Sequence, residues 1–215
     1  MTRLRGRHVP GTLALDMSAR HWRMSSPHRL SDDAGMFAPL IVAGPGWRVF
    51  VAEVALRPID DSDLDALFEQ MRDPESVRMA AFTAENPDDR TAFDVHMAKV
   101  RTLPGVTTRA VTVDGRLAGS IASFVVDGDT EVTYWIDRSF WGQGIAGRAL
   151  ALLLESVRVR PLFARAASDN VRSLKVLQRA GFAIIGTAIS FANARNKEIE
   201  ETILRLDEPA KSAPP

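Results

Sequence analysis

The stretch from Tyr134 to Leu150 constrains the fold most, because its residues predict a strand, a glycine-rich turn and a helix in direct succession. The first N–H groups of a helix have no partner inside the helix, and the peptide dipoles place partial positive charge at that end. Gly142, Gly144 and Gly147 carry no Cβ, so the backbone can turn tightly and approach an anion closely. The segment therefore predicts a phosphate site.

These glycines also match G-x-G-x-x-G, the pattern of dinucleotide-binding domains. That pattern requires a strand that runs directly into the first glycine and further βαβ units downstream. Here the last apolar strand residue is Ile136, several positions before Gly142, and the remaining chain is too short for a doubly wound domain. A nucleotide-dependent oxidoreductase stays open as the weakest alternative.

The segment from Trp141 to Ala146 resembles the acetyl-CoA pyrophosphate loop of the GNAT superfamily of N-acetyltransferases, whose pattern is (Arg/Gln)-x-x-Gly-x-(Gly/Ala). Trp141 departs from the first position of that pattern. Loops of the form Trp-Gly-x-Gly-x-Ala are similar to those of the branch that includes the ribosomal-protein N-terminal alanine acetyltransferases. The resemblance implies acetyl-CoA as the acyl-donor cosubstrate.

A second motif, in residues 168–182, resembles the Asn-x-x-Ser…Gly-Phe helix of the same branch. Asp169 or Asn170 is a suitable N-cap, and Gly181 suits the left-handed position after a helix. Taken alone, the motif favours a capped amphipathic helix packed on a sheet. As the partner of the glycine loop, it favours the acetyltransferase.

The composition limits the possible partners and chemistry of the protein. The chain has 215 residues, 46% of them hydrophobic and 25% charged, which is enough for one core and an appendage. Its formal net charge is zero and it has no basic run, so we expect neither nucleic acid nor a membrane as a partner. The absence of cysteine excludes disulfides and a cysteine nucleophile, and the scattered histidines predict no metal site.

We expect three regions along the chain. Residues 1–48 lack periodicity and are predicted to be a flexible N-terminal extension, residues 49–207 a GNAT acetyltransferase domain, and residues 208–215 a disordered tail. The apolar run at 36–43 contains a proline and is far too short for a membrane span. We expect a cytoplasmic protein that acts as a monomer or a homodimer.

Hydrophobic periodicity and Asp-Gly turns predict an α+β domain. Strands are expected at 51–57, 108–113, 117–126, 131–136, 161–167, 183–191 and 198–206, and helices near 64–73, 75–80, 88–103, 145–157 and 171–180. The helix after the glycine loop is expected to bury Ile145, Ala149, Leu152, Leu153 and Val157. This pattern matches the GNAT fold, a mixed and mostly antiparallel central sheet of six to seven strands with one parallel, splayed pair and helices on both faces.

The resemblance also implies cofactor contacts. In the family, two parallel strands splay apart and the pantetheine arm hydrogen-bonds the open edge of the earlier one. That edge corresponds to Trp135, Ile136 and Asp137, with Asn170 as a further pantetheine contact. The pyrophosphate contacts correspond to the backbone around Gly142, Gln143, Gly144, Ala146, Gly147 and Arg148, with the Arg148 side chain placed for the charge.

Two residues are candidates for proton handling. An amine is protonated near neutral pH, so acyl transfer needs a base, and we predict Glu131, where related enzymes of this branch place a glutamate. Many GNAT enzymes use a tyrosine as the acid, but Leu177 occupies that position, so Ser173 is the candidate that holds the thiolate. A solvated strand-end carboxylate and a serine that only caps or packs are the competing interpretations.

The sequence thus predicts direct transfer of an acetyl group to a primary amine, either a protein N-terminal α-amine or a small molecule. No nucleophile motif argues for a covalent enzyme intermediate. The missing tyrosine keeps open a catalytically impaired acyl-CoA-binding module of the same fold. The acceptor pocket is expected between residues 79–83, the helix that starts near Asp88, and the turn at 191–197.

Overall fold

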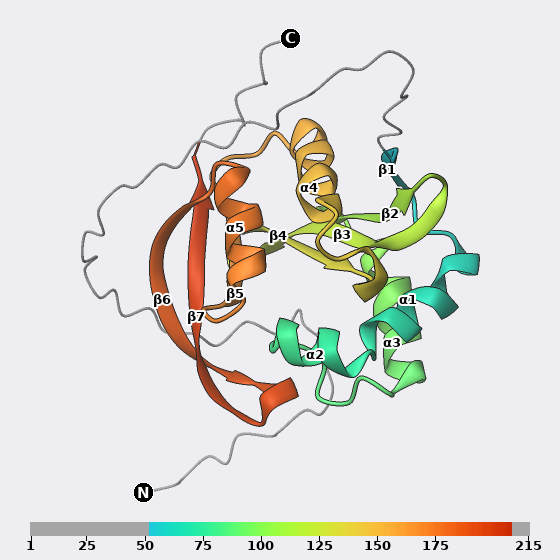
Figure 1. Ribbon diagram of the computed structural model, residues 1–215, viewed down its shortest axis with the longest axis horizontal. Coiled ribbons are helices and arrows are strands. Elements are labelled where there is room, and N and C mark those ends of the chain that lie inside the picture. Colours follow the sequence, from blue (N-terminus) through green and yellow to red (C-terminus); the bar gives the residue numbers. More distant parts are fainter. Residues whose placement is uncertain (1–51, 208–215) are drawn as a thin grey trace, which may run out of the picture.

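A seven-stranded mixed sheet forms the centre of the described part of the chain, residues 52–207, in this computed structural model (Figure 1). The strands are β1 (Val54–Arg57), β2 (Thr107–Val113), β3 (Arg116–Val126), β4 (Asp129–Ile136), β5 (Leu162–Ala167), β6 (Ala183–Ala192) and β7 (Lys197–Leu206). Their spatial order is β1-β2-β3-β4-β5-β7-β6. Within this sheet β4 and β5 run parallel and every other neighbouring pair is antiparallel, which confirms the predicted fold class.

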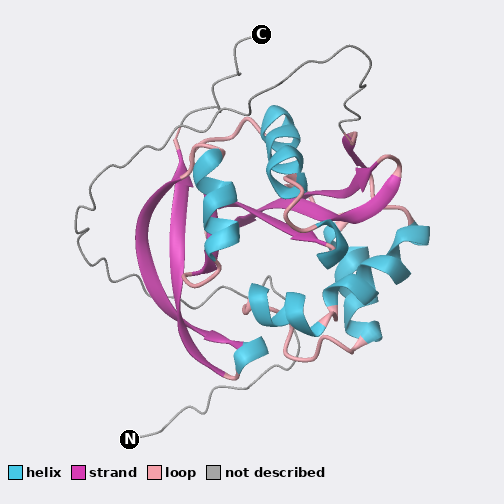
Figure 2. Cartoon of the chain, in the orientation of Figure 1, coloured by secondary structure: helices cyan, strands magenta, loops and turns pink. Residues whose placement is uncertain are grey.

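Five α-helices surround the sheet (Figure 2). They are α1 (Leu64–Met71), α2 (Pro74–Ala80), α3 (Arg90–Val100), α4 (Ile145–Ser156) and α5 (Val171–Arg179), with short 3-10 turns η1 (Asp61–Asp63), η2 (Arg138–Phe140) and η3 (Asn193–Arg195). The proposed extension and tail, and the first residue of the expected strand at 51–57, lie outside the described residues.

The two faces of the sheet carry separate hydrophobic clusters. Side chains alternate along a strand, so Ala110 and Val111 on β2 point to opposite faces. Ala110 packs with residues of α1 and α3 such as Leu67 and Met97, whereas Val111 packs into the cluster that includes Leu153 of α4. Helices α4 and α5 therefore cover one face, and α1 and α3 cover the other.

The antiparallel part of the sheet is connected as the Asp-Gly pairs predict. Asp114 and Gly115 join β2 to β3 with φ of 49° and 77°, and Asp127 and Gly128 join β3 to β4 with φ of 52° and 92°. Positive φ at both central residues is the type I′ geometry, whose twist matches that of the flanking strands. The resulting meander delivers β4 to the centre of the sheet.

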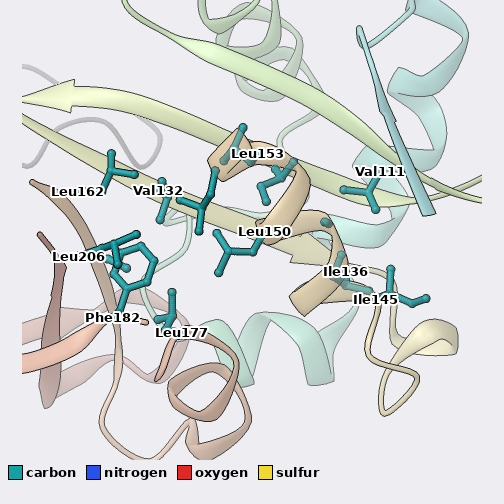
Figure 3. Packing of buried hydrophobic residues seen from close by; sticks show 14 of the residues in the cluster. Val111, Val132, Ile136, Ile145, Leu150, Leu153, Leu162, Leu177, Phe182 and Leu206 are labelled. Atoms are coloured by element: carbon teal, nitrogen blue, oxygen red, sulfur yellow. The ribbon is translucent and has the colours of Figure 1, made fainter. Parts of the chain in front are cut away.

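Helix α4 packs along the sheet in the largest cluster (Figure 3). The prediction of its buried face is partly wrong, because Leu150 and Leu154 are buried where Leu152 is only half-buried. The helix packs on the sheet and also contacts α5 beside it on the same face, so a wider stripe than one helical face is covered. Leu153 is 0% exposed at the centre of this stripe.

Replacing Leu153 with alanine should lower the free energy of unfolding by about 2–5 kcal/mol, because it removes buried methyl groups and leaves a cavity that the sheet cannot fill. Urea denaturation measures this change. The half-buried Leu152→Ala variant is the matched control and should lose less. Equal losses would mean that α4 is not docked by this face.

Candidate active site

The central feature of the candidate site is a gap between the parallel strands. β4 and β5 pair at two positions, Thr130 with Leu162 and Glu131 with Phe163. Beyond Glu131, β4 stays paired with β3 through its last residue, while β5 stays paired with β7 through its last residue. The two strands therefore separate after Glu131 and leave facing edges without a ladder, as expected for the splayed pair.

Of the three residues predicted to contact pantetheine, Ile136 is the one whose backbone N–H faces the gap. The N–H of Asp137 donates to the Ala118 carbonyl on β3 at 2.8 Å, so it is not available to a ligand. A Cβ on Gly119 would lie 2.0 Å from the Trp135 carbonyl oxygen, which places that carbonyl on the β3 side too. Because backbone groups alternate along a strand, the N–H of Ile136 faces the gap.

The glycine turn forms an open cradle at the end of the gap. Gly142 and Gly144 have φ of 77° and 74°, a region that residues with a Cβ rarely adopt. A Cβ on either residue, or on Gly147, would meet no atom within 4 Å. Gly144 is the N-cap of α4 and brings no capping side chain, so the first N–H groups of the helix, including that of Ala146, remain open to an anion.

The polar side chains of this turn have partners within the protein. Arg148 donates from its guanidinium to the carbonyl oxygens of Ala52 at 2.5 Å and of Gln143 at 3.3 Å, and from its backbone N–H to Gly144 at 3.2 Å. Gln143 donates from Nε2 to the Ser139 carbonyl at 2.9 Å. The Arg148 bonds hold the turn against the chain before β1 and use two of the five guanidinium N–H groups, so its predicted contact with the phosphate stays a prediction.

Three cations on α5 line the same cavity and escaped the sequence analysis. They are Arg172, Lys175 and Arg179, and their spacing of three and four residues was the available signal. The Arg172 guanidinium lies 5.8 Å from the centroid of the Trp141 ring, and the Trp141 indole donates to the Ile136 carbonyl at 2.8 Å. This part of the cavity therefore carries positive charge from residues beyond the predicted set.

Asn170 and Ser173 begin α5 and both have partners. The side-chain oxygen Oδ1 of Asn170 accepts from the Ser173 N–H at 3.1 Å, and its Nδ2 donates to the Met79 carbonyl at 3.3 Å. The Ser173 hydroxyl lies 2.8 Å from the Tyr134 hydroxyl. Burial raises the pKa of Tyr134 to about 12, against a smaller opposing effect of the bond to Ser173, so this phenol stays protonated near neutral pH.

Glu131 is 6% exposed and is not a solvated strand-end carboxylate. Its Oε1 accepts from Arg165 Nε on β5 at 2.8 Å, and the Arg165 guanidinium lies 3.7 Å from Glu201 on β7. Ser190 donates to Glu201 at 3.3 Å. Arg165 could not be predicted from the sequence, because it meets Glu131 only through the parallel pairing of the two strands.

Glu131 and Tyr134 point to opposite faces of β4. The Trp135 indole donates to the carbonyl of Gln70 at the end of α1, and Glu131 shares the face of Trp135 by the alternation of side chains. Tyr134 reaches Ser173 on α5, which covers the other face. The carboxylate and the hydroxyl pair thus approach the gap from its two sides.

One continuous cavity of about 660 Å³ contains the glycine turn, the hydroxyl pair and Glu131. It extends beneath α1, the segment 79–84 and α3, where His96 is a further lining residue. Burial, with a smaller effect of Lys99, lowers the pKa of His96, so this imidazole is neutral at pH 7. His96 is therefore a second possible proton acceptor.

Two of the three segments predicted to form the acceptor pocket line the cavity. The segment 79–84 and α3 line the cavity, but residues 191–197 do not. The turn between β6 and β7 instead supports the segment from behind, since Asn193 donates to the Thr83 carbonyl at 2.8 Å and Ala194 to the Ala81 carbonyl at 3.2 Å.

The profile of an acetyltransferase (GNAT) domain matches residues 53–183, more than half of the chain. The chain belongs to the GNAT acetyltransferase family. This confirms the enzyme class predicted from the glycine turn, with acetyl-CoA as the acyl donor of the family. The alternative of a nucleotide-dependent oxidoreductase is rejected. The open cradle and the splayed strands fit such a donor.

Relatives of this GNAT protein are distant in sequence. The uncharacterized N-acetyltransferase p20 of Bacillus licheniformis is 22% identical over 168 residues, which cover 74% of this chain and 94% of that protein. RimJ of Mycobacterium smegmatis, solved with CoA-disulfide, has a TM-score of 0.65 at 19% identity and covers 76% of this chain and 86% of its own.

Two further solved structures share the fold. RimL, a ribosomal L7/L12 α-N-protein acetyltransferase solved with coenzyme A, has a TM-score of 0.62 at 18% identity, with 74% of this chain and 96% of that chain covered. The spermidine N-acetyltransferase of Vibrio cholerae, solved with CoA and spermine, has a TM-score of 0.64 at 13% identity, with 73% and 96% covered. At such identities the likeness shows the fold alone.

No helix within residues 52–207 is long and apolar enough to cross a membrane. No group of three or more histidine or acidic residues within this range is arranged to hold a metal ion.

Replacing Gly144 with valine should weaken acetyl-CoA binding about tenfold or more, because the side chain fills the space from which charge-assisted N–H bonds to a phosphate are made. Isothermal titration calorimetry measures the affinity. Gly128→Val is the matched control, since Gly128 also has a positive φ, 92° against 74° for Gly144, and an equally open Cβ direction in the hairpin at the opposite end of β4. Undiminished affinity in folded Gly144→Val would show that another segment holds the pyrophosphate.

Proposed function

We propose that this protein transfers an acetyl group directly from acetyl-CoA to a primary amine. The observation that carries the proposal is the placement of Glu131 and of the Tyr134–Ser173 pair on opposite sides of one gap, in the cavity that also contains the glycine turn. A thioester held in the gap would meet an amine from one side and leave its sulfur on the other. The acceptor is a protein N-terminal α-amine or a small-molecule amine, and the reaction takes place in the cytoplasm.

Glu131 is the proposed base. The Arg165 bond at 2.8 Å fixes the position of the buried carboxylate and compensates the cost of burying its charge. In the reaction the amine nitrogen loses a proton to Glu131 and its lone pair attacks the carbonyl carbon of the thioester. The carbon–nitrogen bond forms and the carbon–sulfur bond breaks. The nitrogen then gives its second proton to the departing sulfur by way of solvent, so that CoA leaves as a thiol, and no enzyme side chain is acylated.

Ser173 is the proposed partner of the leaving sulfur, and Tyr134 supports it. The phenol of Tyr134 remains protonated and lies 2.8 Å from the Ser173 hydroxyl and 3.3 Å from the Ser173 carbonyl. In the proposed arrangement it donates to the Ser173 hydroxyl while Ser173 donates to the developing thiolate. Leu177, at the position of the usual tyrosine, is 2% exposed and belongs to the core. Tyr134 thus brings a phenol to the cofactor side from a strand instead of from α5.

The residues proposed to hold acetyl-CoA follow from the same geometry. The N–H groups of the glycine turn and of the start of α4 bind the pyrophosphate, and the cations of α5 add charge on the same side. The N–H of Ile136 binds the pantetheine arm in the gap. Asn170 holds the first turn of α5 in place through its cap on Ser173.

Glu131→Gln should lower kcat about a hundredfold or more and remove the acidic limb of the pH–rate profile, because the amide cannot accept a proton. The affinity for acetyl-CoA should change little. Thiol release with an amine panel, measured over a range of pH, checks both expectations.

Glu198→Gln is the matched control, since it removes the same charge from an exposed position on β7 and should leave the rate unchanged. If Glu131→Gln keeps both the rate and the profile while His96→Gln loses them, His96 is the base.

Ser173→Ala should lower kcat by tenfold to a thousandfold with a smaller change in KM, because a donor to the developing thiolate is lost. Tyr134→Phe should have a weaker effect of the same kind. The double variant should be no slower than Ser173→Ala alone, since Tyr134 acts through Ser173. Additive losses in the double variant would mean that the two hydroxyls act separately, and an unimpaired Ser173→Ala would assign the charge to water.

A further inference from the structure

The part of the cavity on the α1 and α3 side has a wall of aromatic and thioether side chains, here called the acceptor chamber. Its wall consists of Phe68, Met71, Met79, Phe82, Phe93 and Met97. The rings of Phe68 and Phe93 lie with centroids 5.3 Å apart and an interplanar angle of 58°, so this wall is packed into the core behind it. Packed aromatic walls with few polar groups are typical of sites for apolar ligand groups.

Few charged groups line the acceptor chamber, although the guanidinium groups of Arg72 and Arg90 lie 5.5 and 5.3 Å from the Phe68 ring centroid without lining the cavity. At the sheet, Glu131 is paired with Arg165. At the opposite end, the exposed Asp89 accepts from the Ala92 N–H as the cap of α3. Among the described lining residues that come from α1, α2, α3 and the loops between them, Asp89 is the only charged one, and His96 is neutral at pH 7.

We propose that the acceptor is a primary amine whose amine-bearing carbon also carries an aliphatic or aromatic group, with that group in the acceptor chamber and the amine beside Glu131. The inference rests on the proposed function and names its substrate class. An α-amine of a peptide with an apolar first residue and an arylalkylamine share this chemistry. One ammonium meets a carboxylate at the sheet, and the adjoining group meets the chamber wall.

The same wall acts against polyamines and against acidic or hydroxylated first residues. A second ammonium along a polyamine would lose its hydration beside Phe68, Phe93 and Met97, which offer no carboxylate in return. A polar side chain would lose hydrogen bonds to water that these walls cannot replace. An apolar side chain of the same size gains by leaving water.

Thiol release from acetyl-CoA tests the preference with peptides that differ only in the first residue, which is phenylalanine, leucine, methionine, serine or aspartate. Phenethylamine and spermidine are the small-molecule arms. The apolar members should show kcat/KM at least about tenfold above the polar ones. Peptide and phenethylamine rates identify the source of the amine. A serine-led or aspartate-led peptide, or spermidine, that equals or exceeds the apolar members overturns the inference.

A variant pair locates the preference in the acceptor chamber. Met79→Glu places a carboxylate in the wall and should lower kcat/KM for the phenylalanine-led peptide at least about tenfold, with acetyl-CoA affinity retained. Val95→Glu adds the same charge on the solvent side of α3, where Val95 is 66% exposed, and should change nothing. Met79→Gln gives a milder, uncharged test. An unaffected preference in folded Met79→Glu and Met79→Gln overturns the assignment.

Binding separates this inference from the proposed reaction. Calorimetry with CoA in place of acetyl-CoA measures acceptor affinity where no transfer occurs. If no amine releases thiol but the phenylalanine-led peptide binds and Met79→Glu abolishes the binding, the transfer is wrong and the chamber stands. If thiol is released without an apolar preference, the transfer stands and the chamber assignment is overturned.

Discussion

The early separation of β4 from β5 is the constraint on which the rest of the site depends. The ladder between them ends at Glu131 and Phe163, although each strand continues beside its other neighbour. A gap at the centre of a sheet joins its two faces, and here the faces carry different helices, α4 and α5 on one and α1 and α3 on the other (Figure 2). A group held in the gap can therefore be reached by a carboxylate from one face and by a hydroxyl from the other. An unbroken ladder would have kept Glu131 and Ser173 apart.

A second set of contacts couples the two sides of the cavity. The Asn170 side chain caps α5 and also donates to the carbonyl of Met79, so the helix on the cofactor side and the wall of the acceptor chamber share one amide. Arg195, in the β6–β7 turn, donates to the Arg78 carbonyl at 3.0 Å and is paired with Asp169, whose pKa it holds below the usual range. The acceptor wall is thus positioned by residues about a hundred positions later in the chain, which anchor a segment that has no sheet partner of its own.

The order and type of the elements could be predicted from the sequence because their determinants are local. Asp114-Gly115 forms a hairpin turn through its own dihedral angles. The glycine turn can be recognised in the sequence because a phosphate cradle needs residues without a Cβ. Side-chain pairings were not predictable in this way. Arg165 meets Glu131 across 34 positions and Arg148 meets Ala52 across 96, and no local pattern encodes either contact. The buried face of α4 was misjudged for a related reason, since a helix covered on two sides does not follow a single stripe.

The hydroxyl pair shows how a site without the usual α5 tyrosine can still supply a donor. Tyr134 and Ser173 together carry two hydroxyl hydrogens, and their mutual bond at 2.8 Å uses one of them. When Tyr134 donates to Ser173, the remaining hydrogen belongs to Ser173, the residue at the first turn of α5. A developing negative charge on sulfur favours this arrangement over the reverse, because each hydrogen bond in the chain then points toward the charge and strengthens the next. The high pKa of the buried phenol, about 12, keeps its hydrogen in place. In the proposed reaction the pair would therefore stabilise the leaving thiolate by donation, without an acid whose pKa lies near neutral pH.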